Sequence, residues 1–201
     1  MILVAFQGSS IDGGAYKDVV NSAQHAPGWL DDVVSAWSTY GLVVFAVLML
    51  VGWWRARRVG AEAAVTALAV PVVVVAAFGI DSLLKTAVRE NRPCQSLHVV
   101  TLEACPAPGD WSFPSNHATV AAAAAVALFF VSRLLGAVAA VAALAMAVSR
   151  VWVGVHYPHD VVAGVLVGTL LAFGAMTLLK RWPEPLARRL TATRLRPLLA
   201  S

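Results

Sequence analysis

The chain alternates long apolar runs with short polar stretches, and several of the runs are long enough to cross a membrane. A hydrocarbon core is about 30 Å thick and requires roughly 20 mostly apolar residues per helix. Five runs approach or reach that length, over about 40–54, 61–84, 118–131, 134–148 and 161–179. The pattern therefore predicts an all-α, polytopic membrane bundle with about five transmembrane helices.

Residues 1–38 mix polar and apolar positions and are predicted to form an N-terminal interfacial segment. From about Pro27 to Thr39, apolar side chains recur at helical spacing, with Trp29 and Trp37 among them. An apolar helix face with tryptophans is typical of a helix that lies in the membrane interface. We predict an amphipathic interfacial helix here; a first turn leading into the first membrane helix fits the same pattern.

The composition agrees with a membrane protein. Of the 201 residues, 59% are hydrophobic and 13% are charged, and the mean hydropathy is +0.74. A soluble domain of this size carries more polar surface. We expect one membrane domain over 1–201, with a membrane lipid rather than a nucleic acid as its partner, and the oligomeric state stays open.

The positions of the basic residues predict the orientation of the bundle. Alternation of the spans places one basic group on one side: Arg55, Arg57, Arg58, Arg133, Lys180, Arg181, Arg188, Arg189, Arg194 and Arg196. The positive-inside rule assigns that side to the cytoplasm. The basic segment 180–201 is then a cytoplasmic tail, bound to the anionic leaflet or solvated. Three polar stretches between the spans fall on the opposite side of the cytoplasmic membrane, facing outward.

The first polar stretch, from Lys85 to Pro93, suits an anionic ligand. Lys85 supplies a point charge and Arg92 a planar fork that pairs with two phosphate oxygens. Asp81, Lys85 and Arg89 are expected on one helix face, with the helix ending near Arg92 because Pro93 follows. Alone, the stretch also fits basic side chains that snorkel at a helix end.

The second stretch, Pro114 to His117, opens the third span. Ser115 or Asn116 at a helix start caps free backbone N–H groups, and the same groups bind anions. His117 would lie one residue from such an anion. Alone, the stretch also fits a capped helix with an incidental histidine.

The third stretch, from Ser149 to Asp160, contains Arg150 at the end of the fourth span. His156 lies in the connecting turn, and Asp160 follows four residues later. A carboxylate beside a histidine fixes its tautomer and stabilises the imidazolium. His159 is interpreted as a loop residue.

Together the stretches combine cationic groups with two histidines, an arrangement suited to phosphoryl transfer. The sequence holds neither a carboxylate cluster typical of magnesium sites nor an evident zinc set. We therefore predict a covalent reaction with no metal and no cofactor. Cys94 and Cys105 share the loop between the second and third spans, where a disulfide or two free thiols are both possible.

These three motifs resemble the signature of the type 2 phosphatidic acid phosphatase superfamily. The match comprises Lys85 with six residues before Arg92-Pro93, then Pro114-Ser115-Asn116-His117, then Ser149-Arg150 with five residues before His156 and three more before Asp160. The common pattern has glycine where this chain has Asn116. A polar residue there is similar to the bacitracin-resistance type undecaprenyl-diphosphate phosphatases, whose motif carries aspartate.

The resemblance implies a metal-independent helical-bundle phosphatase. It implies His156 as the nucleophile, oriented by Asp160, and His117 as the group that protonates the leaving oxygen. Its implied phosphate-binding residues are Lys85, Arg92, Ser115, Asn116 and Arg150.

The expected reaction is hydrolysis of a polyprenyl diphosphate, undecaprenyl or decaprenyl, to the monophosphate, which recycles the carrier lipid for cell-wall glycan synthesis. A phosphatidate, phosphatidylglycerophosphate or prenyl-phospho-sugar phosphatase is the alternative within the same chemistry. A non-catalytic lipid-binding or transport protein is the alternative of another class.

Overall fold

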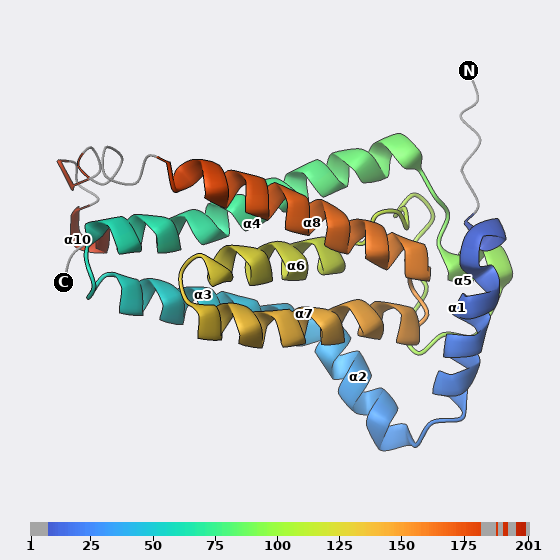
Figure 1. Cartoon of the computed structure of the whole chain (residues 1–201). Helices are drawn as coiled ribbons and strands as arrows, with labels where there is room; N and C mark the ends of the chain where they lie inside the picture. Colours follow the sequence, from blue (N-terminus) through green and yellow to red (C-terminus); the bar gives the residue numbers. More distant parts are fainter. Residues whose placement is uncertain (1–7, 182–187, 189–190, 193–195, 200–201) are drawn as a thin grey trace.

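The computed structural model describes residues 8–181, 188, 191–192 and 196–199, and all regular secondary structure among them is helical (Figure 1). The prediction of an all-α fold is confirmed. The helices are α1 Ser9–Gln24, α2 Gly28–Tyr40, α3 Leu42–Ala56, α4 Ala61–Val88, α5 Pro93–Leu97, α6 Asn116–Phe129, α7 Arg133–Trp152, α8 Pro158–Leu179 and α10 Arg196–Leu199. Much of the predicted basic tail, including Arg189 and Arg194, lies outside the described residues.

Five helices, α3, α4, α6, α7 and α8, run side by side, and α6 lies in the middle of the bundle (Figure 1). They match the five predicted spans to within a few residues at most ends. The helices α4, α7 and α8 are each long and apolar enough to cross a membrane. The helices α2 and α3 reach that length only together, and their axes are bent by 53° at the break between them. The 14 residues of α6 extend only about 21 Å, so this span is shorter than the others.

The N-terminal segment holds two helices where one was predicted. The expected amphipathic helix is α2, which runs into α3 through Gly41. The unpredicted α1 lies across the end of the bundle near α5 (Figure 1). Its buried residues Tyr16, Val20 and Ala23 recur at helical spacing and therefore share one face of the helix. This buried face is short, because it covers only about two turns.

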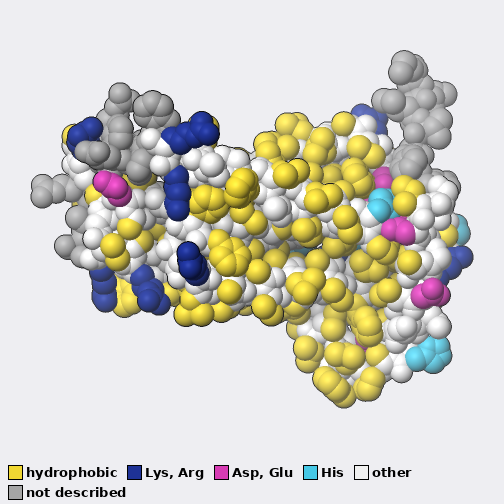
Figure 2. Space-filling model, in the orientation of Figure 1, with side chains coloured by type: hydrophobic (Ala, Val, Ile, Leu, Met, Phe, Trp, Pro, Cys, Tyr) yellow, Lys and Arg dark blue, Asp and Glu magenta, His cyan; other side chains and the backbone are white. Residues whose placement is uncertain are grey.

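The outer surface of the bundle is apolar. Hydrophobic side chains cover the middle of the face in Figure 2, while most of the visible basic groups lie towards one end and most of the visible acids and histidines towards the other. Large aliphatic residues on α4, α7 and α8 point outward, including Val75, Val141 and Leu170. Such an apolar belt is the expected surface of a bundle in hydrocarbon.

Small residues bring α6 and α8 close together. A Cβ atom at Gly168 would lie 2.2 Å from the backbone oxygen of Thr119, and one at Gly164 would lie 2.6 Å from that of Ser115. The Thr119 hydroxyl donates to Gly164 O and to Asp81 Oδ1 on α4, at 3.1 and 2.7 Å. This packing holds the polar starts of α6 and α8 side by side.

Candidate active site

All the predicted site residues lie at the same end of the bundle. Lys85 is in the last turn of α4 and Arg150 in the last turn of α7. The start of α6 carries Ser115, Asn116 and His117. Arg92 immediately precedes α5, His156 lies in the turn between α7 and α8, and Asp160 is in the first turn of α8.

His156 is held from both sides of its ring. Its Nδ1 lies 3.3 Å from Asp160 Oδ2, and its Nε2 lies 3.2 Å from Arg92 Nη1. A guanidinium offers only donors, so Nε2 must accept and Nδ1 must carry the proton that faces Asp160. The arrangement leaves the lone pair of Nε2 on the side of the arginine fork.

The environment of His156 favours the neutral ring. The side chain is 2% exposed, and this burial lowers the pKa of His156 well below its ordinary 6.5. The charges of Arg92, Lys85, Arg150 and His117 lower the same pKa further. The three predicted cations and the second predicted histidine therefore all lie within electrostatic reach of this one imidazole.

Asp160 is oriented by the turn in which it lies. Its Oδ2 accepts a hydrogen bond from Tyr157 N at 2.8 Å and another from the Ser112 hydroxyl. The first of these bonds belongs to a capping box at the start of α8. The backbone oxygen of Asp160 accepts from Ser115 N at 3.0 Å, which ties the start of α6 to the same turn.

Arg92 is 5% exposed, and several polar partners occupy its fork. Its Nε donates to Asp110 O and its Nη2 to Asp110 Oδ1, both at 2.9 Å, while Nη1 donates to Val155 O at 2.9 Å. Nearby, Lys85 Nζ donates to Trp111 O at 2.7 Å. Both cations are thus anchored to the loop before α6.

Arg150 is 7% exposed and reaches across from α7. Its Nη1 donates to the Ser38 hydroxyl on α2 and lies 3.4 Å from Glu103 Oε2. Its Nε is buried with no hydrogen-bond partner in the described part of the chain. A phosphate oxygen is the kind of acceptor that such a donor lacks.

The start of α6 differs in one respect from the prediction. Ser115 occupies the N-cap position, but its side chain makes no capping hydrogen bond. Instead, Ser115 Oγ and Asn116 Oδ1 are buried and have no partner among the described atoms. Their hydrogen-bonding capacity is therefore available beside the free N–H groups of the helix start.

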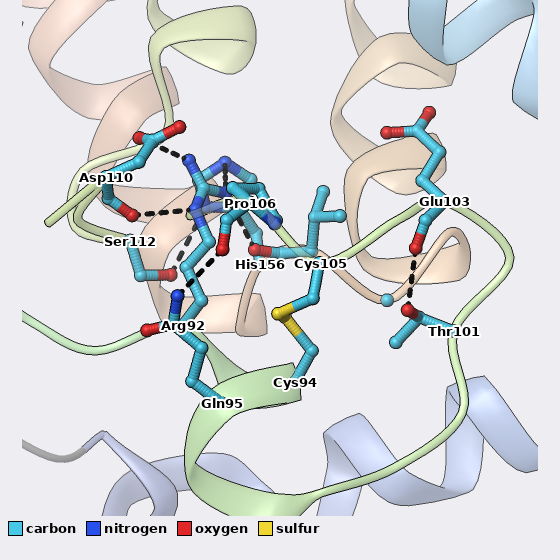
Figure 3. The surroundings of a disulfide bond; sticks show 12 residues. Arg92, Cys94, Gln95, Thr101, Glu103, Cys105, Pro106, Asp110, Ser112 and His156 are labelled. Carbon is cyan, nitrogen blue, oxygen red and sulfur yellow. Dashed lines mark hydrogen bonds and ion pairs between the residues drawn. A yellow bond between two sulfur atoms is a disulfide. The ribbon is translucent and has the colours of Figure 1, made fainter. Parts of the chain in front are cut away.

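The loop that carries these contacts is closed by a disulfide between Cys94 and Cys105, which confirms the bridge and excludes two free thiols. Figure 3 shows the bridge beside Arg92, Gln95 and His156. Gln95 Nε2 also donates to Pro106 O at 2.8 Å. The bridge and this bond hold α5 against the loop that supplies the partners of Arg92.

Two sequence-based interpretations were wrong. Arg89 does not extend the α4 face of Asp81 and Lys85, because the helix ends at Val88 and Arg89 adopts a left-handed conformation at φ 56°. The helix therefore ends before the predicted position near Arg92, and Arg92 lies beyond it with its Nη1 3.2 Å from His156 Nε2. His159 is not a loop residue: it lies in the first turn of α8, 16% exposed, with its ring between carboxylates.

Several residues of the site were not predicted, namely Ser38, Glu90, Glu103, Asp110 and Ser112. They come from α2 and from irregular segments, where periodicity offers no signal. Among the described residues, one trio of possible metal ligands has its ligand atoms within 4.8 Å of one another, Glu90, His159 and Asp160.

The geometry defines a helical membrane protein with a cluster of cationic and histidine side chains at one end of the bundle. The PAP2 superfamily model matches residues 64–184, more than half of the chain. The undecaprenyl-diphosphatase BcrC of Bacillus subtilis (strain 168) is 30% identical over 158 residues, covering 77% of each chain. The chain belongs to the PAP2 superfamily of lipid phosphatases.

Other relatives differ in what their names say they act on. The decaprenylphosphoryl-5-phosphoribose phosphatase of Mycobacterium tuberculosis (strain H37Rv) is 30% identical over 171 residues, covering 83% of this chain and 82% of that protein. The crystal structure of Aquifex aeolicus LpxE matches with a TM-score of 0.67 at 22% identity, covering 88% of this chain and 99% of that one. The similarity to LpxE shows a shared fold.

Proposed function

We propose that this protein hydrolyses a polyprenyl diphosphate to the monophosphate at the outer face of the cytoplasmic membrane, through a phosphohistidine. The observation that carries the proposal is the placement of His156 between Asp160 and Arg92, at 3.3 and 3.2 Å. One ring nitrogen is oriented by a carboxylate, and the other faces a phosphate-binding group. This is the arrangement that an in-line attack by an imidazole requires.

In the first step, His156 Nε2 attacks the terminal phosphorus and the bond to the bridging oxygen breaks. The polyprenyl monophosphate leaves with a proton from His117. Asp160 stabilises the positive charge that develops on the ring, because it faces the protonated Nδ1. In the second step, His117 takes a proton from water, and the hydroxide attacks the phosphohistidine to release inorganic phosphate and restore His156.

Side chains supply the positive charge that this transition state needs. Lys85, Arg92 and Arg150 act on His156 from three segments, so their charges converge on the position of the phosphoryl group. The unpartnered Ser115 hydroxyl and the N–H groups of the α6 start provide further donors. With these groups in place, the reaction needs no metal, and activity is expected to survive an excess of chelator.

An apolar groove supports a long lipid chain as the rest of the substrate. The groove has a volume of about 620 Å³ and is lined by α2 and α7, including Trp37, Ala145 and Ser149. Trp37 and Ser149 are the chain neighbours of Ser38 and Arg150, which contact each other at the site. A polyprenyl chain in the groove would therefore have its diphosphate beside Arg150.

The relative BcrC, named for undecaprenyl diphosphate, favours the diphosphate over the alternatives. The test is phosphate release by purified protein from undecaprenyl diphosphate, phosphatidate, phosphatidylglycerophosphate and decaprenylphosphoryl-5-phosphoribose in detergent micelles, with His156→Ala as the control. We expect the highest kcat/KM on the diphosphate and no turnover by the variant. Preference for another lipid would replace the proposed substrate, and equal turnover by His156→Ala would refute the proposed mechanism.

A further inference from the structure

A second cluster of ionisable groups adjoins the proposed site, and it shares only Asp160 with the mechanism above. His159 lies at its centre. Its Nδ1 is 2.8 Å from Asp12 Oδ1, and its Nε2 is 2.9 Å from Glu90 Oε1 and 3.5 Å from Asp160 Oδ1. Glu90 and Asp160 are 1% and 0% exposed, so two carboxylates are buried beside one imidazole.

The contacts determine which protons the ring carries. Both nitrogens of His159 lie at hydrogen-bond distance from carboxylate oxygens, and an imidazolium donates to both of them at once. A metal ion between Nε2 and Glu90 would hold the two ligand atoms about 3.3 Å apart, from bond lengths near 2.0–2.1 Å at the tetrahedral angle. The observed 2.9 Å is instead the length of an N–H···O bond.

Asp12 fixes this ring from a different helix. Its Oδ2 accepts from the backbone N–H of His159 at 2.7 Å, so Asp12 contacts both the backbone and the side chain of that residue. Its own backbone departs from helical geometry, at φ −142° and ψ 24°. Farther along α1, Tyr16 OH donates to Gly154 O at 2.8 Å. The helix α1 therefore contacts the chain on both sides of His156, at Gly154 before it and at His159 after it.

We infer that α1 is a working part of the active site, and that Asp12 and His159 are positioning residues for Asp160. Two buried carboxylates repel each other, and a cation between them offsets part of that repulsion and favours the ionised form of Asp160. Asp160 then remains an aligned anion and can hold the Nδ1 proton of His156. The inference rests on the proposed phosphatase chemistry but adds a group of residues to it.

The kinetic test compares Asp12→Asn and His159→Gln with Asp18→Asn, which removes an exposed carboxylate from the same helix. We expect kcat to fall about tenfold in the first two variants at unchanged KM, because Asp12→Asn weakens the charge-assisted hold on His159 and His159→Gln removes the cation beside Asp160. The phosphate-binding cations stay in both variants. Asp18→Asn should match the parent. In an Asp160→Asn background, Asp12→Asn should cost little more, because both act through one carboxylate.

Unchanged kcat in both variants, or losses that add fully to that of Asp160→Asn, would overturn the inference. A second measurement needs no variant: ¹⁵N histidine spectra of the parent protein near neutral pH should contain one ring, assigned by its loss in His159→Gln or by through-bond correlation, with both nitrogens protonated. A neutral ring or a metal-bound ring at His159 would overturn the inference. If the parent releases no phosphate, the proposed function fails, and the spectra still decide the state of His159.

Discussion

Arg92 Nη1 lies 3.2 Å from His156 Nε2, on the ring edge opposite Asp160. Because a guanidinium cannot accept a hydrogen bond, this contact assigns the lone pair of the imidazole to Nε2. The same contact places the guanidinium proposed to bind phosphate beside the nitrogen proposed to attack. One pair of residues thus fixes both the tautomer and the direction of approach.

The first prediction concerns pH. Burial and the charge of Arg92 lower the pKa of His156, so the native enzyme should keep a neutral nucleophile well below pH 6.5. In Arg92→Gln one of these charges is lost, and the acid limb of kcat/KM should move to higher pH, although the residual rate is lower. The prediction is contradicted if the acid limb of kcat/KM in the parent lies at or above pH 6.5 and does not move in Arg92→Gln.

The same shift has a consequence for stability. The unfolded chain binds a proton at His156 near the ordinary value of 6.5, whereas the folded protein resists it. The contribution of this group to stability is therefore constant above that pH and becomes more unfavourable as pH falls below it.

The second prediction concerns Asp110, which pairs with Arg92 Nη2 at 2.9 Å and whose side chain is 52% exposed. A carboxylate in that position occupies part of the fork that the substrate phosphate requires. Asp110→Asn should therefore lower KM a few-fold with little change in kcat, measured on the diphosphate. A raised KM would mean that Asp110 orients Arg92 rather than competing with phosphate.

The third prediction concerns the groove between α2 and α7. Ala145→Trp should fill it and raise KM for the long polyprenyl diphosphate about tenfold, while leaving a short soluble diphosphate unaffected. The matched control is Ala137→Trp on an exposed position of the same helix that does not line the groove. Equal effects on long and short substrates would place the lipid chain elsewhere.

The fourth prediction concerns the packing of α6 on α8. Gly168→Leu should force the helices apart, since its Cβ would meet Thr119 O at 2.2 Å, and should destabilise the protein by about 1–3 kcal/mol. A Cβ atom at Gly174 on the same helix would meet no atom of the described residues within 4 Å, so Gly174→Leu should be neutral. Thermal unfolding in detergent measures both, and equal melting temperatures would refute the close contact.

Much of the fold and of the proposed site was accessible from sequence because membrane helices are long, apolar and bounded by polar stretches. The three motifs fall at helix ends, and the alternation of the spans together with the family resemblance predicted that Lys85, Arg92 and His156 would meet. Local rules also placed Asp160 correctly, because a turn of helix separates it from His156.

Contacts between distant segments were not accessible in this way. Asp12 and His159 are 147 residues apart, and no periodicity links them. The helix α1 was missed because Gly13 and Gly14 weaken its propensity and its buried face is small. Ser112 and Glu90 lie in irregular backbone, where a side chain is aimed by loop geometry that the sequence pattern does not encode.

The most direct test of the proposed phosphohistidine is trapping in alkaline detergent with a substrate labelled at the terminal phosphate, because a phosphohistidine survives alkali and hydrolyses in acid. The label is expected on the imidazole of His156, stable in alkali and released by acid. The label should accumulate in His117→Gln, in which hydrolysis of the intermediate is slowed, and be absent from His156→Gln. Label on another residue, or turnover by His156→Gln at the parental rate, would contradict the account.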